Sequence, residues 1–164
     1  NNQSIKVINN FRGLKYRQEI IYKNSKICCI NDSKATSFSS SIDIIKSKEK
    51  VFWIVGGIPK LGDKFYLSKN DCKNIKAYIF GKNKQFFIKQ FKNKISYYYS
   101  KNLKTIIQKI LHDIKSSKSN LHKTILFSPS AASFDTFSNF EERGDYFNFL
   151  LKKYKVKKTI NAII

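Results

Sequence analysis

Three short apolar runs constrain the fold of this chain more than any other feature of its sequence. They occupy residues 51–55, 75–80 and 124–127, and they end at Gly56-Gly57, Gly81 and Ser128-Pro129. Apolar runs of this length, of which 51–55 is uninterrupted, are typical of strands covered on both faces when each is ended by a turn signal. The sequence therefore predicts the central strands of a sheet that has structure packed on either side.

Helical periodicity alternates with these runs. It predicts helices over residues 38–47, 84–91, 103–114 and about 144–153, with the clearest apolar face in the third. Residues 16–22, 26–30 and 95–99 indicate further strands, residues 58–74 a loop with a helical turn, and residues 5–11 a short helix or linker. Strands alternating with helices predict an α/β fold: a three-layer, Rossmann-like domain with a mostly parallel sheet flanked by helices.

The composition supports a single folded domain over residues 1–164. Hydrophobic residues make up 41% of the chain and aromatic residues 15%, which is enough for a core and excludes global disorder. No apolar stretch approaches the roughly 20 residues of a membrane-spanning helix. The chain contains no Met, so we interpret it as a piece of a longer protein.

The cysteines and histidines give no sign of a metal or catalytic site. No zinc-ligand spacing links Cys28, Cys29 and Cys72 to His112 or His122, and the histidines form no catalytic triad. We expect buried, reduced thiols in a cytoplasmic protein, with Cys28 and Cys29 on opposite faces of one strand.

The formal net charge of +21 predicts attraction to polyanions. The lysines are spread along the chain without a dense basic tail, so we expect most of them to be solvated surface residues. A basic nucleic-acid-binding module is an alternative, with Tyr97, Tyr98 and Tyr99 as candidate stacking residues. That alternative leaves the polar loops after the strands unexplained.

Three such loops follow predicted strands, where ligands bind in sheets of this kind. Residues 31–36 combine a carboxylate, an ammonium group and hydroxyls, and residues 56–60 place two glycines before a lysine. Residues 128–135 begin with a run of small residues that leaves backbone amides accessible to an anion, and an acidic and aromatic segment follows at 139–145. Each loop also has a purely structural interpretation: a capping loop, a tight turn and a charged helix start.

Four motifs in these loops carry a family resemblance, in order, within residues 11 to about 152. They are Asn31-Asp32-Ser33-Lys34-Ala35-Thr36, Gly56-Gly57 with Lys60, Ser128-Pro129 through Ser133-Phe134-Asp135, and Phe140-Glu141-Glu142-Arg143-Gly144-Asp145. Together they resemble the carboxy-terminal domain of the Mur ligase family, in its D-glutamate-adding branch. Gly13-Leu14 and Arg17-Gln18-Glu19 are similar to the segment that opens this domain in that family.

The resemblance implies one domain of a three-domain, ATP-dependent ligase of peptidoglycan synthesis. The other domains would bind the UDP-linked substrate and most of the ATP and Mg²⁺. The whole enzyme would join D-glutamate to UDP-N-acetylmuramoyl-L-alanine through an acyl phosphate. It would be a monomer without a membrane or specific nucleic-acid partner.

The resemblance also implies roles for individual residues. By position, Arg17 resembles a residue that contacts the nucleotide phosphate, and Asp32 resembles one that contacts the ribose. The residues that resemble D-glutamate-binding positions are Lys34, Thr36, Lys60, Ser133 and the backbone at Phe140. No catalytic residue and no metal ligand is implied in this domain, so the isolated domain is expected to be inactive.

Several positions depart from the family pattern. Lys15-Tyr16 stands where proline- or alanine-histidine is usual, Ser37 where asparagine is common, and Ser130-Ala131 where alanine-cysteine is usual. The nearest alternatives are ligases that add L-lysine or diaminopimelate and folylpolyglutamate synthases. They share the fold but not the run from Ser133-Phe134-Asp135 to Asp145.

Overall fold

The computed structural model describes residues 13–163, so the segment predicted at residues 5–11 lies outside the described part. The strands are β1 (Glu19–Lys23), β2 (Ile27–Asn31), β3 (Lys50–Gly56), β4 (Ile75–Phe80), β5 (Ser96–Ser100) and β6 (Lys123–Phe127). The helices are α2 (Phe38–Lys46), α3 (Lys84–Phe91), α4 (Leu103–Lys115), α5 (Phe140–Lys153) and α6 (Val156–Ile163).

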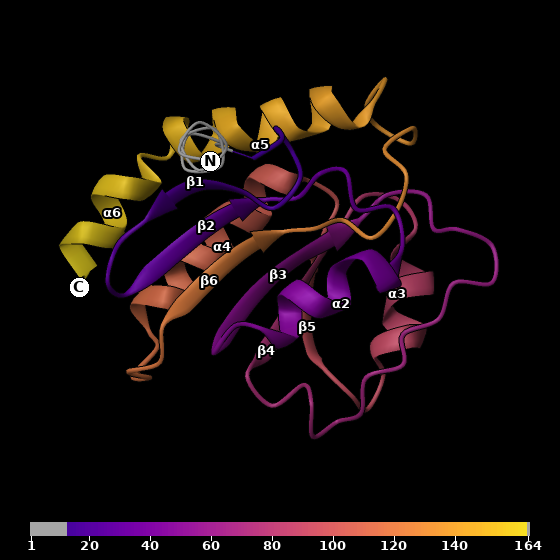
Figure 1. Cartoon of the computed structure of the whole chain (residues 1–164), viewed down its shortest axis with the longest axis horizontal. Coiled ribbons are helices and arrows are strands. Elements are labelled where there is room, and N and C mark those ends of the chain that lie inside the picture. Colours follow the sequence, from indigo (N-terminus) through magenta and orange to yellow (C-terminus); the bar gives the residue numbers. More distant parts are fainter. Residues whose placement is uncertain (1–12, 164) are drawn as a thin grey trace, which may run out of the picture.

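The six strands form one sheet in the order β1-β2-β6-β3-β4-β5 (Figure 1). Only the edge strand β1 runs antiparallel to its neighbour, and the other four pairings are parallel. Helices α2 and α3 cover one face of the sheet, and α4, α5 and α6 cover the other. The predicted three-layer α/β architecture is confirmed.

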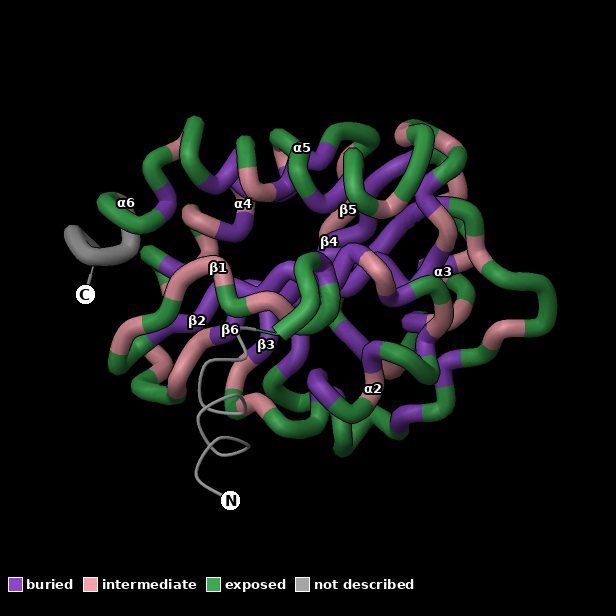
Figure 2. The backbone as a smooth tube through the Cα atoms, turned by 45° about the horizontal axis from the view of Figure 1, so that its top comes forward, coloured by how far each residue is buried: buried purple, intermediate pink, exposed green. Residues whose placement is uncertain are grey.

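The position of β3 in the sheet explains why its sequence is an uninterrupted apolar run. In β3, Val51, Trp53 and Val55 face α2 and α3, whereas Phe52 and Ile54 face α4 and α5. All five of these residues are buried. The backbone through the middle of Figure 2 carries mostly the colour of buried residues. Covering both faces removes the alternation of apolar and polar residues that a half-exposed strand would show.

The α2–α3 face is packed mainly with aromatic rings. The Phe38 ring lies 5.5–6.1 Å, centroid to centroid, from each of five neighbouring rings: Trp53, Phe65, Phe86, Phe87 and Phe91. The loop over residues 57–74 supplies Phe65, Leu67 and Cys72 to this face, so its own apolar side chains hold it against the sheet. The expected loop is confirmed, but the helical turn expected within it is present only as non-helical hydrogen-bonded turns, such as those at residues 69–73.

Two elements begin three or more residues away from the sequence-based expectation, and one helix was not expected. Strand β1 begins at Glu19 because Tyr16 and Gln18 adopt φ of 60° and 48°, which bends the chain before the strand. Helix α5 begins at Phe140, earlier than expected, because the Asn139 side chain accepts a 2.7 Å hydrogen bond from the Glu142 amide. The sequence pattern did not predict helix α6.

The cysteines behave as predicted within this fold. Cys28, Cys29 and Cys72 are buried free thiols, and Cys28 and Cys29 point to opposite faces of β2. Burial raises the pKa of each of the three thiols. In the described part of the chain, no helix is long and apolar enough to cross a bilayer.

Candidate functional site at the carboxyl ends of the strands

The three polar loops meet where the connections of two neighbouring strands diverge. After β3 the chain crosses the α2–α3 face, whereas after β6 it leads to α5 on the opposite face. Such a switch point is where open α/β sheets bind ligands. Residues 58 and 132 pair there as an isolated bridge, with the Ile58 amide donating to the Ala132 carbonyl at 2.8 Å. The second and third loops are therefore joined directly.

Asp32 connects the first loop to the third. It is buried, and its Oδ2 accepts a 2.7 Å hydrogen bond from the Ser128 hydroxyl while its Oδ1 accepts one of 3.1 Å from the Gln18 amide. Burial raises the pKa of Asp32, and the hydrogen bonds from Ser128 and Gln18 and the nearby charge of Arg17 oppose that shift. The carboxylate is thus fixed in orientation from two sides.

Three serine hydroxyls form a buried cluster behind Asp32. The Ser41 Oγ lies 2.6 Å from both the Ser128 Oγ and the Ser130 Oγ. The indole of Trp53 donates a 2.8 Å hydrogen bond to the Ser128 carbonyl, which fixes the loop onto the aromatic core. Ser130, a departure from the family pattern, is therefore integrated into the scaffold of the site.

Arg143 ties the first and third loops to helix α5. Its guanidinium is fully buried and donates to the Ser33 hydroxyl at 3.1 Å, the Ser33 carbonyl at 2.6 Å and the Ala131 carbonyl at 2.9 Å. Burial lowers the pKa of Arg143 to about 10, and the nearby charge of Asp135 acts in the opposite direction. Both carboxylate oxygens of Asp135 are buried without a hydrogen-bond partner in the described structure.

Tyr16, another departure from the family pattern, also contacts α5. Its hydroxyl donates a 2.8 Å hydrogen bond to Asp145, which together with burial raises the pKa of Tyr16 to about 12. A Cβ at Gly144 would lie 2.3 Å from the Tyr16 ring, so only glycine fits at that position. The Asn31 side chain donates to the Gly144 carbonyl at 3.0 Å, which adds a second tie at the same point.

Part of the predicted site surrounds one cleft. Arg17, Asp32 and Lys34 line it together with Gln18, Ala35 and Ser40, and its volume is about 320 Å³. The Arg17 side chain is exposed, and the Lys34 ammonium lies 3.8 Å from the centre of the Phe140 ring. The structure therefore gathers both predicted nucleotide-contacting residues and the first predicted D-glutamate ligand at one opening.

The remaining predicted residues lie on the same edge of the sheet but not in that cleft. Ser133 is buried and directly follows the bridge at Ala132, whereas Lys60 and Thr36 are not buried. The Phe140 carbonyl accepts a 2.8 Å hydrogen bond from the Ser33 hydroxyl, so this part of its backbone serves the scaffold.

The two histidines lie away from these loops, as expected. His112 lies on α4, and its Nδ1 is 3.4 Å from the Asp113 carboxylate. His122 precedes β6, and its backbone amide donates to Glu49 at 2.7 Å. Among the described residues, no group of three or more His, Cys, Asp or Glu side chains gathers as a metal site.

Sequence reasoning missed the role of Arg143. The sequence supports two interpretations of the segment around it, a family motif or an ordinary charged helix start. An arginine within an otherwise apolar helix face was the available signal, because Phe147, Leu150 and Leu151 of α5 are buried on the same side. Ser33 and Tyr16 gave no comparable signal, since their partners are 107 to 129 residues away along the chain.

Several known proteins are similar in sequence to this chain over nearly its whole length. It is 37% identical to the UDP-N-acetylmuramoylalanine–D-glutamate ligase of Wolbachia sp. subsp. Brugia malayi, over 96% of this chain and 31% of the relative. The ligase of the same name from Rickettsia felis is 35% identical over 90% of the chain and 32% of its own length. That from Francisella tularensis strain SCHU S4 is 32% identical over 95% of the chain and 37% of its own length.

The chain spans about a third of the length of these curated relatives. No family model matches it. The relatives share one name, and the alignments cover nearly all of the chain. The fold is the three-layer α/β architecture that the alternation of strands and helices predicted. The chain belongs to the Mur ligase family, and the match fits the carboxy-terminal domain of its D-glutamate-adding members.

Proposed function

We propose that this chain is the amino-acid-binding domain of an ATP-dependent ligase that joins D-glutamate to UDP-N-acetylmuramoyl-L-alanine. The observation that carries the proposal is the cleft at the carboxyl ends of the strands, where Arg17, Asp32 and Lys34 converge. Two cations beside a fixed carboxylate suit a ligand with anionic groups and hydroxyls. The names of the relatives supply D-glutamate and the UDP-linked substrate, whereas ATP is taken from the family resemblance of Arg17 and Asp32.

In this proposal the nucleotide lies against the first loop. The Arg17 guanidinium contacts a phosphate, and the Asp32 carboxylate accepts a hydrogen bond from a ribose hydroxyl. The fixed orientation of Asp32, held by Ser128 and Gln18, supports that role because an oriented acceptor loses less freedom on binding. ATP, when bound, supplies the phosphoryl group that activates the substrate carboxylate. Magnesium is assigned to another part of the ligase.

D-glutamate is assigned to Lys34, Thr36, Lys60, Ser133 and the backbone at Phe140. Its two carboxylates need cations and fixed donors, which lysine ammonium groups, hydroxyls and the amino-terminal end of α5 can supply. The bridge at Ile58 and Ala132 supports a shared role for Lys60 and Ser133, since it holds their two loops side by side. These groups orient the attacking amine, and none of them acts as a nucleophile.

Titration of the isotope-labelled chain with D-glutamate and L-glutamate tests the assignment. We expect D-glutamate to shift the amide resonances of Lys34, Lys60, Ser133 and Phe140 more than L-glutamate does. In a Lys60→Met variant, the affinity for D-glutamate should fall about tenfold, since hydrogen bonds to charged groups contribute on that scale. The matched variant Lys89→Met, on the exposed side of α3, should bind as the parent chain does.

Three outcomes would argue against the assignment: equal shifts with both enantiomers, shifts elsewhere on the surface, or preference for L-lysine or diaminopimelate. The last would favour a ligase for another amino acid. We also expect the isolated chain to form no amide product from ATP, D-glutamate and the UDP-linked substrate, which chromatography of the reaction mixture would detect.

The tyrosine run at residues 97–99 gives little support to a nucleic-acid-binding function. Tyr98 packs against the α4 face and Tyr99 against the α3 face of the sheet. Tyr97 is 42% exposed. Residues on an edge strand that alternate in this way do not form a continuous stacking surface.

A further inference from the structure

Two neighbouring cavities lie at the amino-terminal ends of the strands, at the opposite edge of the sheet from the candidate site. Their volumes are about 370 and 410 Å³, and Ser117, just after α4, lines both. We call them the basic cavities because lysines dominate their lining. The first is lined by Lys50, Lys73 and Lys76, and the second by Lys26, Lys115, Lys118 and Lys123.

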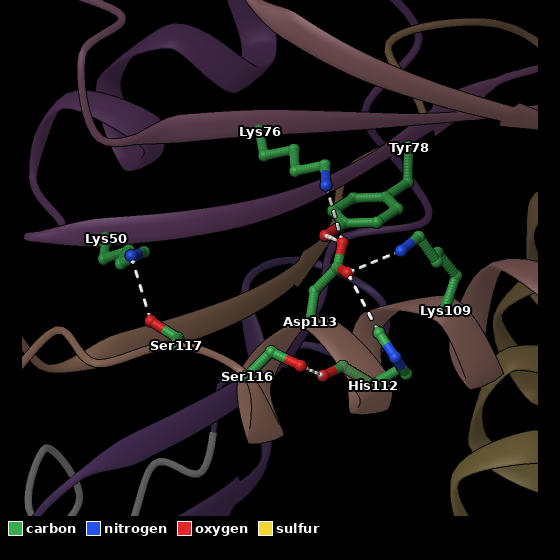
Figure 3. Close-up of polar contacts among 8 residues, drawn as sticks. All are labelled: Lys50, Lys76, Tyr78, Lys109, His112, Asp113, Ser116 and Ser117. Atoms are coloured by element: carbon green, nitrogen blue, oxygen red, sulfur yellow. Dashed lines mark hydrogen bonds and ion pairs between the residues drawn. The ribbon is translucent and has the colours of Figure 1, made fainter.

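One carboxylate, Asp113, is the only acidic side chain among the described residues that line these cavities. It accepts 2.7 Å hydrogen bonds from the ammonium groups of Lys76 and Lys109 and from the Tyr78 hydroxyl, as Figure 3 shows. Its charge is therefore shared between two lysines. Positive charge exceeds negative charge throughout the lining of both cavities.

Two of these lysines are held close together by the sheet. Lys50 and Lys123 are register partners on the adjacent strands β3 and β6. The Lys50 ammonium donates to the Ser117 hydroxyl at 3.1 Å, and the Lys123 ammonium donates to the Ser119 carbonyl at 2.8 Å. These acceptors are neutral, so they orient the two ammonium groups without cancelling their charge.

The positive charges of neighbouring lysines affect the pKa of Lys123. Burial lowers its pKa, and the charges of Lys50 and Lys26 lower it further. Repulsion of this kind is relieved when an anion binds between the cations. The Ser117 hydroxyl, which accepts from Lys50, lies at the same opening and can donate its own proton to that anion.

We propose that the basic cavities bind a small oligophosphate, an anion with two or more linked phosphate groups. One phosphate would lie beside Lys50 and Lys76, and the next would pass Ser117 to reach Lys118 and Lys123. Linked phosphates match two adjacent cationic cavities better than a single phosphate, because the second group binds without a further loss of translational freedom. The described lining contains no exposed aromatic ring for base stacking, which disfavours single-stranded nucleic acid.

Titration of the full 164-residue chain with tripolyphosphate, followed by calorimetry and amide resonances at roughly physiological salt, tests the proposal. We expect saturable binding with shifts at Lys50, Ser117 and Lys123. Orthophosphate should bind at least about tenfold more weakly, since it forms fewer charge-assisted hydrogen bonds. A Lys50→Gln/Lys123→Gln variant should also lose about tenfold in affinity.

A matched variant, Lys89→Gln/Lys92→Gln, removes the same charge from exposed positions at α3 and should bind tripolyphosphate as the parent does. Equal weakening in both variants would mean that only diffuse charge attracts the anion, and it would overturn the proposal. Equal binding of orthophosphate, or binding of a thymidine oligonucleotide in the absence of tripolyphosphate binding, would overturn it as well.

If the Lys50→Gln/Lys123→Gln variant melts at a lower temperature than the parent, the pair Lys73→Gln/Lys118→Gln replaces it. These two side chains line the two cavities without being buried, so their loss should not disturb the fold. The same loss of affinity is expected, and unchanged affinity would contradict the proposal.

Discussion

At the carboxyl-terminal edge of the sheet, Asp32 and Arg143 are buried, and each is held by several directed hydrogen bonds. At the amino-terminal edge, seven lysines line the basic cavities around one shared carboxylate. The first edge has few charges in fixed positions, and the second has many charges with few directed contacts. The net charge of this chain is therefore a poor guide to where its charged groups are held in fixed positions.

The largest expected difference between the two edges concerns the loss of one cation. Arg143→Met should lower the free energy of unfolding by about 3 kcal/mol or more, because it leaves three buried acceptor sites unpaired. Lys118→Met, at the other edge, should change it by no more than about 0.5 kcal/mol because that side chain is not buried. Urea unfolding of both variants checks this. Similar losses would remove the distinction between the edges.

A second prediction concerns how closely the loops approach one another at the carboxyl-terminal edge. A Cβ at Gly57 would lie 2.2 Å from the Ala132 carbonyl oxygen, and Gly57 has a φ of +125°. Gly57→Ala should therefore cost about 2–3 kcal/mol through the clash and the backbone strain.

Gly62 provides the matched control for that substitution. It has a φ of +76°, but no heavy atom lies within 4 Å of the point that a Cβ would occupy, so Gly62→Ala should cost only about 1 kcal/mol of backbone strain. Thermal unfolding of both variants gives the comparison. If Gly57→Ala were the milder change, the loops would not be as rigidly joined as the bridge at Ile58 indicates.

The smallest expected effect concerns two carboxylates, Asp113 and Asp32, whose contributions to stability should change in opposite directions with pH. Burial alone would raise the pKa of Asp113, but hydrogen bonds from Lys109, Lys76 and Tyr78 hold it below its ordinary value of 3.8. Its contribution to stability is therefore present above that pH and is lost as pH falls through the lowered pKa. Asp32 behaves oppositely: burial raises its pKa, so its contribution declines as pH rises through the raised value.

Unfolding free energies of the parent, Asp113→Asn and Asp32→Asn, measured from about pH 3 to about pH 7, test this contrast. The stability of the parent relative to Asp113→Asn should grow with pH, reaching about 1 kcal/mol for a partly exposed ion pair. Relative to Asp32→Asn it should decline with pH. Parallel slopes for the two variants would contradict the assigned environments.

Much of this fold could be predicted from the sequence because the central strands carry their signal locally. Residues 51–55 are apolar at every position, residues 75–80 at all but one, and glycines mark the ends of both runs. The meeting of the three polar loops also followed, since parallel strands bring their carboxyl ends to one edge. Helix α6 was missed because its beginning is rich in lysine and follows the bend at Lys155, which has a φ of 47°.

The internal architecture of the candidate site could not be predicted in the same way. The contact of Tyr16 with α5, the burial of Arg143 and the serine cluster each join segments 87 to 129 residues apart. Nothing local distinguishes these side chains from a surface tyrosine, a helix-start arginine or loop serines. Their roles depend on the final packing of α5 against the first loop.

That dependence on α5 has a consequence for the order in which the chain can fold as it is synthesised. Asn31, Ser33 and Tyr16 emerge early, yet their partners in α5 follow 107 to 129 residues later. At about 5–20 residues per second, the first loop waits roughly 5 to 25 seconds for the helix that orders it. Contacts between residues so distant in sequence also slow folding after the chain is released from the ribosome. We therefore expect the sheet to form first, with the loops at its carboxyl-terminal edge becoming ordered only when α5 docks.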